Sequence, residues 1–461
     1  MAQASRKLVG RMPRGPKWAG LLLATGSEEG SSREESSSDD YGSEDEGVRC
    51  SPLVIALATS GGCCCFLLVL LAVMAYVGWM QVSKANNTSA WHDASVPPPD
   101  FPRYMGCSGC EVGFKDNAEI RRCVEPCFSM DLVLQWESFA QNHGYSLVYF
   151  PSRPGPRGEP PVNISAWWLP ADTRRLPPGT LPPRVVALHG LASNCNHCGV
   201  QSTCFHLRAL GFSCLTPSVR DYGLSGPSTH PGVMTWGYDY PQDLLGAWDY
   251  AVADPDGILG GPLPPSQVGI MGFSKGALGA AIAFNLEKRI PGVWIDSAPF
   301  GGLYSMIDAY VRPYAGFLTP LIRQPVWWAA NHFAGVPLDY YRPTEMFRSC
   351  SPPRRQVAVS HSTADNVVPV REAISAIFTI AARPECHELW LWTPEGTCNG
   401  ASHHVEMWRY PDETRQMLCE FWSWTFRRNN SLCGLDDLPK LDQSTTRARR
   451  QVLSRASMLH I

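Results

Sequence analysis

A five-residue motif has the residue types and the spacing of an enzyme nucleophile. Residues 272–276 read Gly-Phe-Ser-Lys-Gly, after the apolar run Val268–Met271 and before the small residues of Ala277–Leu286. Two glycines around a serine allow a strained turn from a strand into a helix, and this turn lifts the serine hydroxyl above the edge of a sheet. The motif therefore predicts Ser274 as a nucleophile that forms an acyl-enzyme intermediate.

Further along the chain stand the groups that such a serine needs. Its hydroxyl is a weak nucleophile until a base accepts the proton, and a carboxylate must orient that base. Asp365 lies in a short loop after the apolar run Val357–Val359, and the consecutive histidines His403 and His404 precede the last expected helix. Serine, acid, histidine is the chain order expected for a nucleophile on this kind of turn. Spacing alone allows either histidine to be the base.

The oxyanion that develops during acyl transfer needs hydrogen-bond donors. One expected donor is the backbone N–H of Lys275, directly after the nucleophile. The other is expected in the loop after His189-Gly190, from Leu191 or Ala192. We interpret His189 itself as a structural loop residue. This chemistry uses side chains and backbone alone, so the sequence predicts neither a metal nor a cofactor.

The elements that must position these residues alternate along the chain. Apolar runs of strand length alternate with stretches of helical spacing, after an opening pair of runs around a Pro/Gly-rich turn. We expect strands at Ser146–Pro151, Val162–Leu169, Arg184–Leu188, Phe212–Thr216, Val268–Met271, Val293–Ile295, Val357–Val359 and Glu388–Trp392. We expect helices at Asp243–Val252, Ala277–Leu286, Arg371–Ile380 and Glu413–Phe426. This pattern predicts an α/β fold with a mostly parallel central sheet.

Residues 301–349 interrupt the alternation with a segment rich in tyrosine, tryptophan and phenylalanine. An insertion at this point is expected to lie over the ends of the strands, where open α/β sheets bind ligands. It predicts a helical cap over Ser274, in which Trp327 and Trp328 belong to an apolar wall for the substrate. The alternative is that these two tryptophans serve only in packing.

From about Tyr145 to Phe426 the chain resembles the α/β-hydrolase superfamily, and it is most similar to the branch of esterases, monoacylglycerol lipases and acyl-thioesterases. The matching blocks, in chain order, are Leu188–Leu191, Arg220–Gly226, Gly272–Gly276, Asp296–Phe300, Asp365–Pro369 and His404–Trp408. The resemblance implies the α/β-hydrolase fold, with Ser274, Asp365 and His404 as the catalytic residues.

Three details of the resemblance concern single residues. In relatives the catalytic histidine usually stands directly before a short stretch that ends in an aromatic residue, which favours His404 over His403. Relatives usually carry Met or Gln after the nucleophile, where this chain has Lys275. Its charge is expected either to alter the site or to point to solvent. The match at Asp296 is interpreted as strand-end geometry and not as a catalytic role.

Other parts of the chain surround this region. Residues 1–50 start basic and become acidic and serine-rich, which predicts a disordered tail. Residues 53–80 carry no charge and are long enough for one transmembrane helix. The alternatives are a buried core helix and, for the basic start, an organelle transit sequence. We predict a stalk or small cap with cysteines at residues 81–135. The hydrolase domain is expected at residues 136–438 and a basic polar tail at residues 439–461.

Glycosylation sequons and clustered cysteines favour a lumenal or extracellular hydrolase domain with a cytosolic N-terminus. Potential glycosylation sequons follow the predicted span at Asn86, Asn87, Asn163 and Asn429. Most of the 17 cysteines also follow it, in clusters that suggest disulfides: Cys107, Cys110, Cys123 and Cys127, then Cys195, Cys198 and Cys204. Zinc is the alternative for the two Cys-x-x-Cys pairs.

Together these features predict a membrane-anchored serine hydrolase of carboxylic esters or thioesters, with lipid-like acyl substrates favoured. A serine aminopeptidase-like peptidase and a catalytically silent binding protein of the same fold are the alternatives. The formal net charge of −3 offers no field that would attract nucleic acid.

Overall fold

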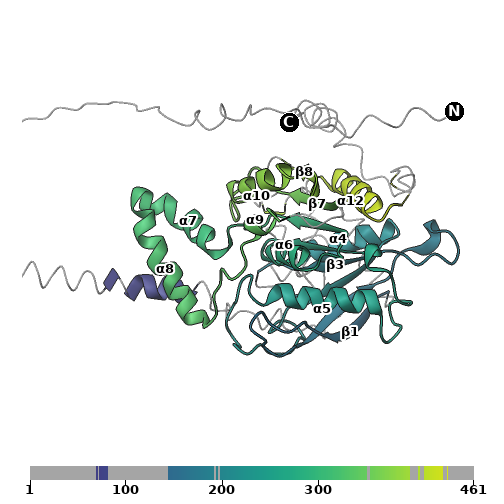
Figure 1. Cartoon of the computed structure of the whole chain (residues 1–461), viewed down its shortest axis with the longest axis horizontal. Helices are drawn as coiled ribbons and strands as arrows, with labels where there is room; N and C mark the ends of the chain where they lie inside the picture. Colours follow the sequence, from purple (N-terminus) through teal and green to yellow (C-terminus); the bar gives the residue numbers. More distant parts are fainter. Residues whose placement is uncertain are drawn as a thin grey trace, which may run out of the picture. The chain divides into compact units, whose positions relative to one another are not determined.

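A computed structural model describes residues 69–70, 72–80, 144–191, 194–195, 198–349, 354–394, 403–404, 410–428 and 433. All of these lie in one of the two compact units of the chain, Cys63–Asp437. The centre of this unit is an eight-stranded sheet with the strand order β1-β2-β4-β3-β5-β6-β7-β8 (Figure 1). Its strands are β1 Ser146–Pro151, β2 Asn163–Leu169, β3 Arg184–Leu188, β4 Ser213–Pro217, β5 Val268–Phe273, β6 Gly292–Asp296, β7 Arg355–Ser360 and β8 His387–Trp392.

The sheet is mostly parallel, as the alternation of elements predicts. Strand β2 pairs antiparallel with β1 and with β4, and every pairing from β4 through β3 to β8 is parallel. The register sets Phe273 of β5 opposite Asp296 of β6, and Asp296 opposite Ser360 of β7. The loops after β5, β6 and β7 therefore leave the same edge of the sheet side by side.

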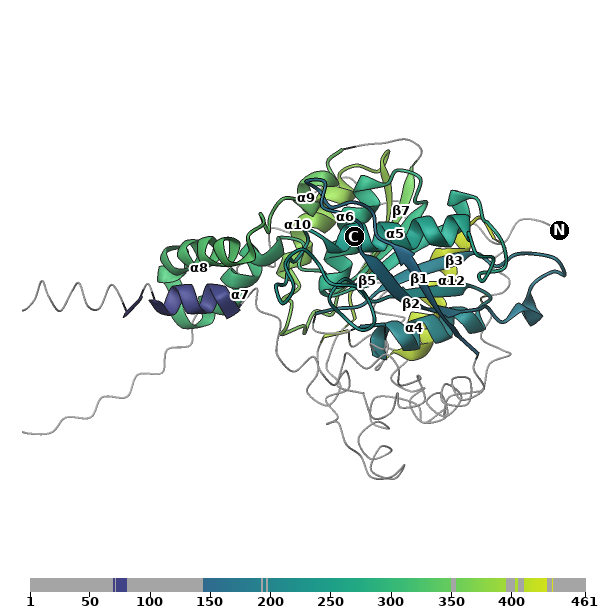
Figure 2. The ribbon, with the colours of Figure 1, turned by 90° about the horizontal axis from the view of Figure 1, so that it is seen from below.

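Helices cover both faces of the sheet (Figure 2). On one face α4 (Cys198–Ala209) and α12 (Pro411–Thr425) share a core cluster with residues of β3 and β5. On the other face α5 (Tyr240–Ala253), α6 (Lys275–Leu286) and α10 (Arg371–Ala381) form a second cluster. Strands buried on both faces are apolar without alternation. Every residue of β3, β5 and β6 is buried, and this continuity made them recognisable in the sequence.

Helix α4 is an element that the sequence did not predict. It packs into the core through Val200, Cys204 and Leu207, but Gln201 and His206 are buried as well. Such a helix lacks the contrast between an apolar and a polar face on which sequence prediction depends. Burial lowers the pKa of His206 to about 3, so this histidine is neutral in the core.

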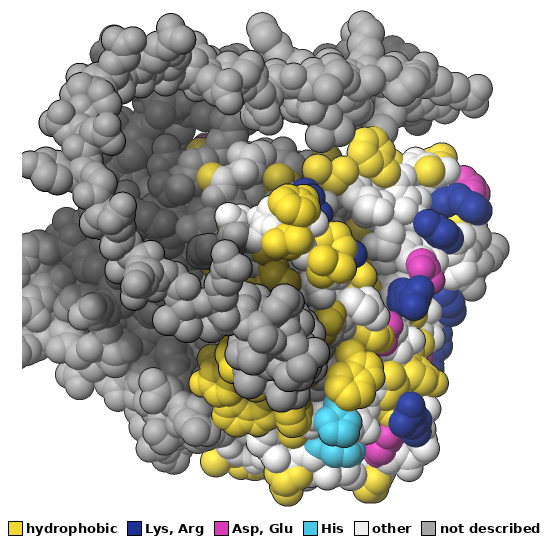
Figure 3. Space-filling model, turned by 90° about the vertical axis from the view of Figure 1, so that its left-hand side faces the viewer, with side chains coloured by type: hydrophobic (Ala, Val, Ile, Leu, Met, Phe, Trp, Pro, Cys, Tyr) yellow, Lys and Arg dark blue, Asp and Glu magenta, His cyan; other side chains and the backbone are white. Residues whose placement is uncertain are grey.

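The insertion is helical, as expected. It consists of α7 (Gly302–Ala315), α8 (Thr319–Ala334) and the short α9 (Pro343–Met346). Val326, Ala330 and Ala334 of α8 share a core cluster with Leu278 and Ile282 of α6. The helical residues 72–80 also pack against α8, since Met74 belongs to the same cluster and Gly78 closely approaches Ala329. Figure 3 shows exposed apolar side chains at this end of the molecule. The exposed large side chains of the hairpin are Tyr310, Phe317, Leu318, Leu321, Trp328 and Phe333.

Several expectations fall outside the described residues. Of the predicted span 53–80, only residues 69–70 and 72–80 are described, and they are helical. No helix in the described ranges has both the length and the apolarity that crossing a membrane requires. The tail 1–50, the segment 81–135 and the tail 439–461 all lie outside the described residues.

One disulfide has both of its cysteines among the described residues, and it lies outside the predicted clusters. Cys419 of α12 is bonded to Cys433, and Cys386 is also disulfide-bonded. The expectation of disulfides at Cys195 and Cys204 is wrong, because both are buried free thiols. Both are core residues, with Cys204 on α4 itself, and burial raises the pKa of Cys195 to about 12. Cys107, Cys110, Cys123 and Cys127 lie outside the described residues.

A buried ion cluster holds the loop after β4 against α5. The Arg220 guanidinium donates to both carboxylate oxygens of Asp243, at 2.7–3.1 Å, and to Asp239 at 3.1 Å. All three side chains are almost completely buried. Burial would lower the pKa of Arg220, but the two carboxylates outweigh burial and raise it. Burial raises the pKa of Asp239 and of Asp243, and the charge of Arg220 opposes that rise.

Replacing Arg220 by Met should destabilise the protein strongly, because it leaves two buried carboxylates without their cation. Loss of one member of a buried ion pair costs about 3–5 kcal/mol. The matched control is Arg312→Met, which breaks a pair between Asp308 and an arginine side chain that is 58% exposed. The control should cost less than about 1 kcal/mol. Thermal unfolding measures both, and equal melting temperatures for the two variants would contradict the assignment.

Candidate active site

Ser274 sits on the strained turn that its motif predicts. It connects β5 to α6 with φ 52° and ψ −120°, a backbone conformation that residues other than glycine rarely adopt. The turn is held at both ends by backbone hydrogen bonds. The N–H of Ser274 donates to the carbonyl of Asp296 at 2.8 Å, and the Ser274 carbonyl accepts from Ala277 at 2.9 Å. The serine is thereby fixed at the carboxyl edge of the sheet.

The two glycines of the motif are required by close backbone approach. A Cβ on Gly272 would collide with the carbonyl of Gly276, and a Cβ on Gly276 would collide with the carbonyl oxygens of His189 and Leu188. Helix α6 therefore begins in direct contact with the end of β3. This contact brings the expected oxyanion loop beside the nucleophile.

The loop after β3 passes Ser274 at Gly190. A Cβ on Gly190 would lie 3.3 Å from Ser274 Cβ and 4.0 Å from its Oγ. His189 holds the loop, since its Nδ1–H donates to the Gly190 carbonyl at 2.8 Å and its Nε2 accepts from Val219 at 3.2 Å. Both ring nitrogens are thus occupied by backbone, as expected for a structural histidine. Leu191 follows and is exposed, while Ala192 lies outside the described residues.

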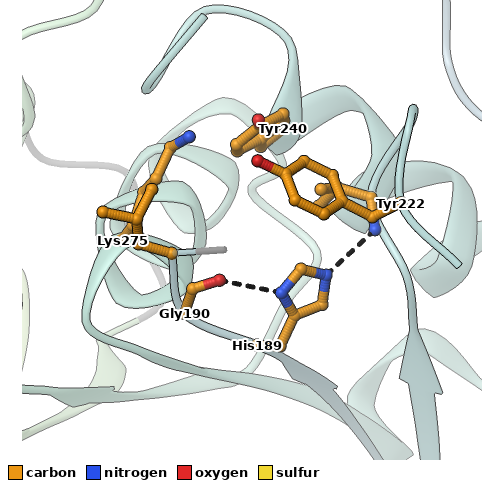
Figure 4. Close-up of a pocket in the computed structure, with 7 residues that line it drawn as sticks. His189, Gly190, Tyr222, Tyr240 and Lys275 are labelled. Carbon is orange, nitrogen blue, oxygen red and sulfur yellow. Dashed lines mark hydrogen bonds between the residues drawn. The ribbon is translucent and has the colours of Figure 1, made fainter. Parts of the chain in front are cut away.

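Lys275 does not point to solvent. Its side chain is buried, and its Nζ lies 3.9 Å from the ring centroid of Tyr240 and 5.7 Å from that of Trp236. Aromatic faces stabilise a cation at such distances. Figure 4 shows Lys275 beside the two tyrosines Tyr222 and Tyr240, across a small recess from His189 and Gly190. Burial raises the pKa of Tyr222 to about 12, so this phenol is neutral.

Asp365 orients a histidine, and that histidine is His403. The Asp365 Oδ1 accepts hydrogen bonds from the N–H groups of Val367 and Val368 at 2.9 and 2.8 Å. The Asp365 Oδ2 accepts a hydrogen bond from His403 Nδ1 at 2.7 Å. Burial would raise the pKa of Asp365, but the hydrogen bonds and charge of His403 outweigh burial and lower it. His403 Nε2 is buried and has no hydrogen-bond partner among the described residues. Nε2 is therefore the nitrogen available to accept a proton.

His404, which the sequence favoured as the base, is hydrogen-bonded elsewhere. Its Nδ1 lies 2.5 Å from Asp296 Oδ1, and its backbone has φ 55°. The positive φ at His404 turns the two neighbouring side chains to different carboxylates. Asp296 was interpreted as strand-end geometry only, so sequence reasoning missed its contact with this histidine. The sequence did carry a signal for two separate pairs. It has one acid at the end of β6, Asp296, another in the loop after β7, Asp365, and two consecutive histidines further along the chain.

The two cap tryptophans lie away from the recess of Figure 4. Trp328 is 65% exposed and its ring stacks on that of His332. Trp327 packs edge-on against Tyr304 of α7. A different cap residue reaches the catalytic loops, because the Tyr310 hydroxyl donates to the Val367 carbonyl at 3.1 Å, two residues after Asp365.

Metal-ligating side chains do not gather within the described ranges in any group of three or more. Cys195, one of the cysteines considered for zinc, is a buried thiol with a raised pKa. Thiolates, not thiols, bind zinc. The other cysteines of that hypothesis are Cys107, Cys110 and Cys198, of which the first two lie outside the described residues.

Comparison with known proteins finds similarity to solved structures at low sequence identity. No protein-family model and no curated protein matches the chain. Among solved structures, it is similar to an esterase of Pyrococcus furiosus (19% identity, TM-score 0.43, 61% of this chain and 91% of that chain). It is also similar to a puromycin-hydrolyzing peptidase of Mycobacterium tuberculosis (17% identity, TM-score 0.39, 61% and 39%). A third is the acylaminoacyl peptidase of Pyrococcus horikoshii (12% identity, TM-score 0.42, 66% and 44%).

The described part of this chain has the mostly parallel sheet and the strand-turn-helix position of the serine that are typical of the α/β-hydrolase fold. It therefore has an α/β-hydrolase-like fold. What the site does must be argued from its own residues.

Gly276→Ala should destabilise the turn, because the added Cβ meets two backbone carbonyls that cannot move aside. Overpacking of this kind costs about 1–3 kcal/mol or more. Gly279→Ala is the control on the same helix, where the nearest atom is the flexible Leu188 Cδ2 at 3.2 Å. This variant should be close to the wild type, since alanine favours helix by up to about 1 kcal/mol. If thermal unfolding shows the two variants to be equally stable, the close approach at Gly276 is incorrect.

Proposed function

We propose that this protein is a serine hydrolase in which Ser274 is the nucleophile, His403 the general base and Asp365 the acid that orients the base. The observation that carries the proposal is the Asp365–His403 hydrogen bond of 2.7 Å, which leaves Nε2 as the proton acceptor. Asp365 follows β7, and Ser274 follows β5 at the same edge of the sheet. His403 thus has the role of general base that the resemblance to α/β-hydrolases implied for His404.

The reaction follows from these positions. His403 Nε2 accepts the Ser274 hydroxyl proton as Oγ attacks the substrate carbonyl, and Asp365 stabilises the resulting imidazolium. The backbone N–H of Lys275 and that of Leu191 or Ala192 stabilise the oxyanion. The imidazolium then protonates the leaving alcohol, thiol or amine, and an acyl-serine remains. Water, deprotonated by His403, attacks the acyl group, which releases the acid and restores Ser274.

For the substrate we propose carboxylic esters or thioesters with a lipid-like acyl group. The proximity of the cap to the catalytic loop supports this class, because α7 bonds to the Asp365 loop through Tyr310. The α7–α8 hairpin also presents exposed apolar side chains, among them Phe317, Leu321 and Trp328. Apolar surfaces of this kind favour acyl chains over polar groups. A serine aminopeptidase-like peptidase is the alternative, and it would use the same triad.

Ser274→Ala should abolish covalent labelling by a fluorophosphonate probe, because the alkoxide that attacks phosphorus is lost. His403→Ala should slow labelling and ester turnover by about four to six orders of magnitude. Ser375→Ala, an exposed serine on α10, is the control and should react like the wild type. Assays with octanoyl, acetyl and aminoacyl substrates separate the substrate classes. Labelling that persists in Ser274→Ala, or a folded wild type that never labels, would refute the proposal.

For location we propose a single-pass membrane protein with a cytosolic N-terminus and a lumenal or extracellular catalytic domain. The uncharged segment 53–80 supports an anchor. The Cys419–Cys433 disulfide supports an oxidising compartment, because the cytosol keeps thiols reduced. The three free cysteines of the described ranges do not argue against it, since all of them are buried.

Asn163 should carry a glycan when the chain is made in a secretory system. It opens β2 in the sequence Asn-Ile-Ser, and its side chain is exposed. Treatment with an N-glycosidase should increase the gel mobility of the wild type by more than that of Asn163→Gln. The topology is incorrect if neither protein shifts and if protease added to sealed microsomes digests the catalytic domain from the cytosolic side.

A further inference from the structure

A second aspartate–histidine pair lies directly beside the proposed base. His404 and Asp296 are hydrogen-bonded at 2.5 Å between Nδ1 and Oδ1, and their side chains are only 8% and 3% exposed. The first pair, His403 with Asp365, uses the other histidine of the same dipeptide. The proposed mechanism has no step for this buried second pair.

The second pair contacts both partners of the proposed proton transfer. The rings of His403 and His404 lie 3.8 Å apart, centre to centre, at an angle of 43°. On another side, His404 packs edge-on against Phe273, the residue before the nucleophile, with ring centres 5.7 Å apart. The Asp296 backbone carbonyl accepts the N–H of Ser274 at 2.8 Å. Asp296 thus bonds to the nucleophile turn with its backbone and to His404 with its side chain.

From this arrangement we infer that His404 and Asp296 are a positioning pair, which fixes the ring of His403 relative to Ser274 and places a second carboxylate near the imidazolium that His403 becomes. The inference rests on the proposed function. It assigns neither residue a contact with the reacting atoms. It explains why two histidines and two acids meet at one edge of the sheet.

The charges around His403 are consistent with this role. Burial, followed by the charge of His403, holds the pKa of His404 well below its usual range, so the stacked ring stays neutral when His403 is protonated. His361 is also buried and neutral, since burial lowers its pKa, and its Nε2–H donates to the Val368 carbonyl. Tyr310 lies near Asp365 and is an uncharged phenol with a raised pKa. Asp365 and Asp296 are therefore the two groups that can balance a positive His403.

Asp296 has to ionise to act in this way. Burial raises the pKa of Asp296 to about 7 and the charge of Asp365 adds to this rise, whereas the charge of His403 opposes it. A proton on His403 therefore favours the ionised carboxylate, and the ionised carboxylate favours a proton on His403. Removing the acid should therefore take away one of the two negative charges that stabilise the imidazolium of His403.

The test is the second-order rate of fluorophosphonate labelling of the full-length chain, measured against pH. Asp296→Asn keeps the backbone carbonyl for Ser274 and an amide oxygen for His404, but it removes the charge. The midpoint of the acid limb of the rate profile should move to lower pH by on the order of one unit. The plateau rate should fall roughly 10- to 100-fold. Asp308→Asn, an acid on the cap helix α7, is the control and should change neither value.

His404→Asn tests the positioning role independently. The asparagine amide can still donate to Asp296, but the ring on which His403 rests is gone. The plateau rate should fall roughly 10- to 100-fold, with the acid limb changed much less than in Asp296→Asn. Cooperative melting near the wild-type temperature confirms that each variant is folded.

Three outcomes would overturn the inference. A folded Asp296→Asn with an unchanged acid limb and plateau rate would reduce the pair to packing, and so would a folded His404→Asn that labels at the wild-type rate. Complete loss of labelling in His404→Asn, with labelling retained in His403→Ala, would make His404 the base. Failure of the proposed function itself is distinct, because Ser274→Ala would then still label.

Discussion

The strained backbone of Ser274 is the constraint on which the rest of the site depends. A residue with a side chain in this conformation costs about 1–3 kcal/mol, so the surrounding structure must hold it. Three strands take part in doing so. Gly276 packs against the end of β3, β5 delivers the serine to the turn, and Asp296 at the end of β6 accepts its N–H. The position of the nucleophile is therefore set by the sheet and not by the loop alone.

The same register brings the acids and the histidines together. Because β5, β6 and β7 end opposite one another, Asp296 and the Asp365 loop meet at one edge, and the dipeptide His403-His404 inserts between them. Each histidine bonds to one carboxylate through Nδ1. The arrangement resolves a problem of buried charge, because neighbouring carboxylates would repel each other without a cation or a hydrogen-bond donor between them.

Much of the fold was accessible from the sequence, for identifiable reasons. The expected strand Arg184–Leu188 matches β3, and the predicted strands and helices from β5 onwards correspond to β5, α6, β6, β7, α10, β8 and α12. Strands buried on both faces are continuous apolar runs, and the turn glycines mark where they end. Helix α4 was missed because its buried side includes polar residues, and the pairing of cysteines was misjudged because clustering in sequence does not imply contact in space.

By itself, the sequence determined the α/β alternation, the nucleophile turn and the order of serine, acid and histidine, because these depend on local patterns and on positions along the chain. Only the tertiary structure decided which histidine pairs with which acid. Two consecutive residues have the same spacing to every distant group, so spacing cannot distinguish them. The direction of each ring depends on the backbone at His404, with its φ of 55°, and on carboxylates that approach from two different strands. The buried orientation of Lys275 was decided in the same way, by the aromatic rings of Tyr240 and Trp236 that surround it.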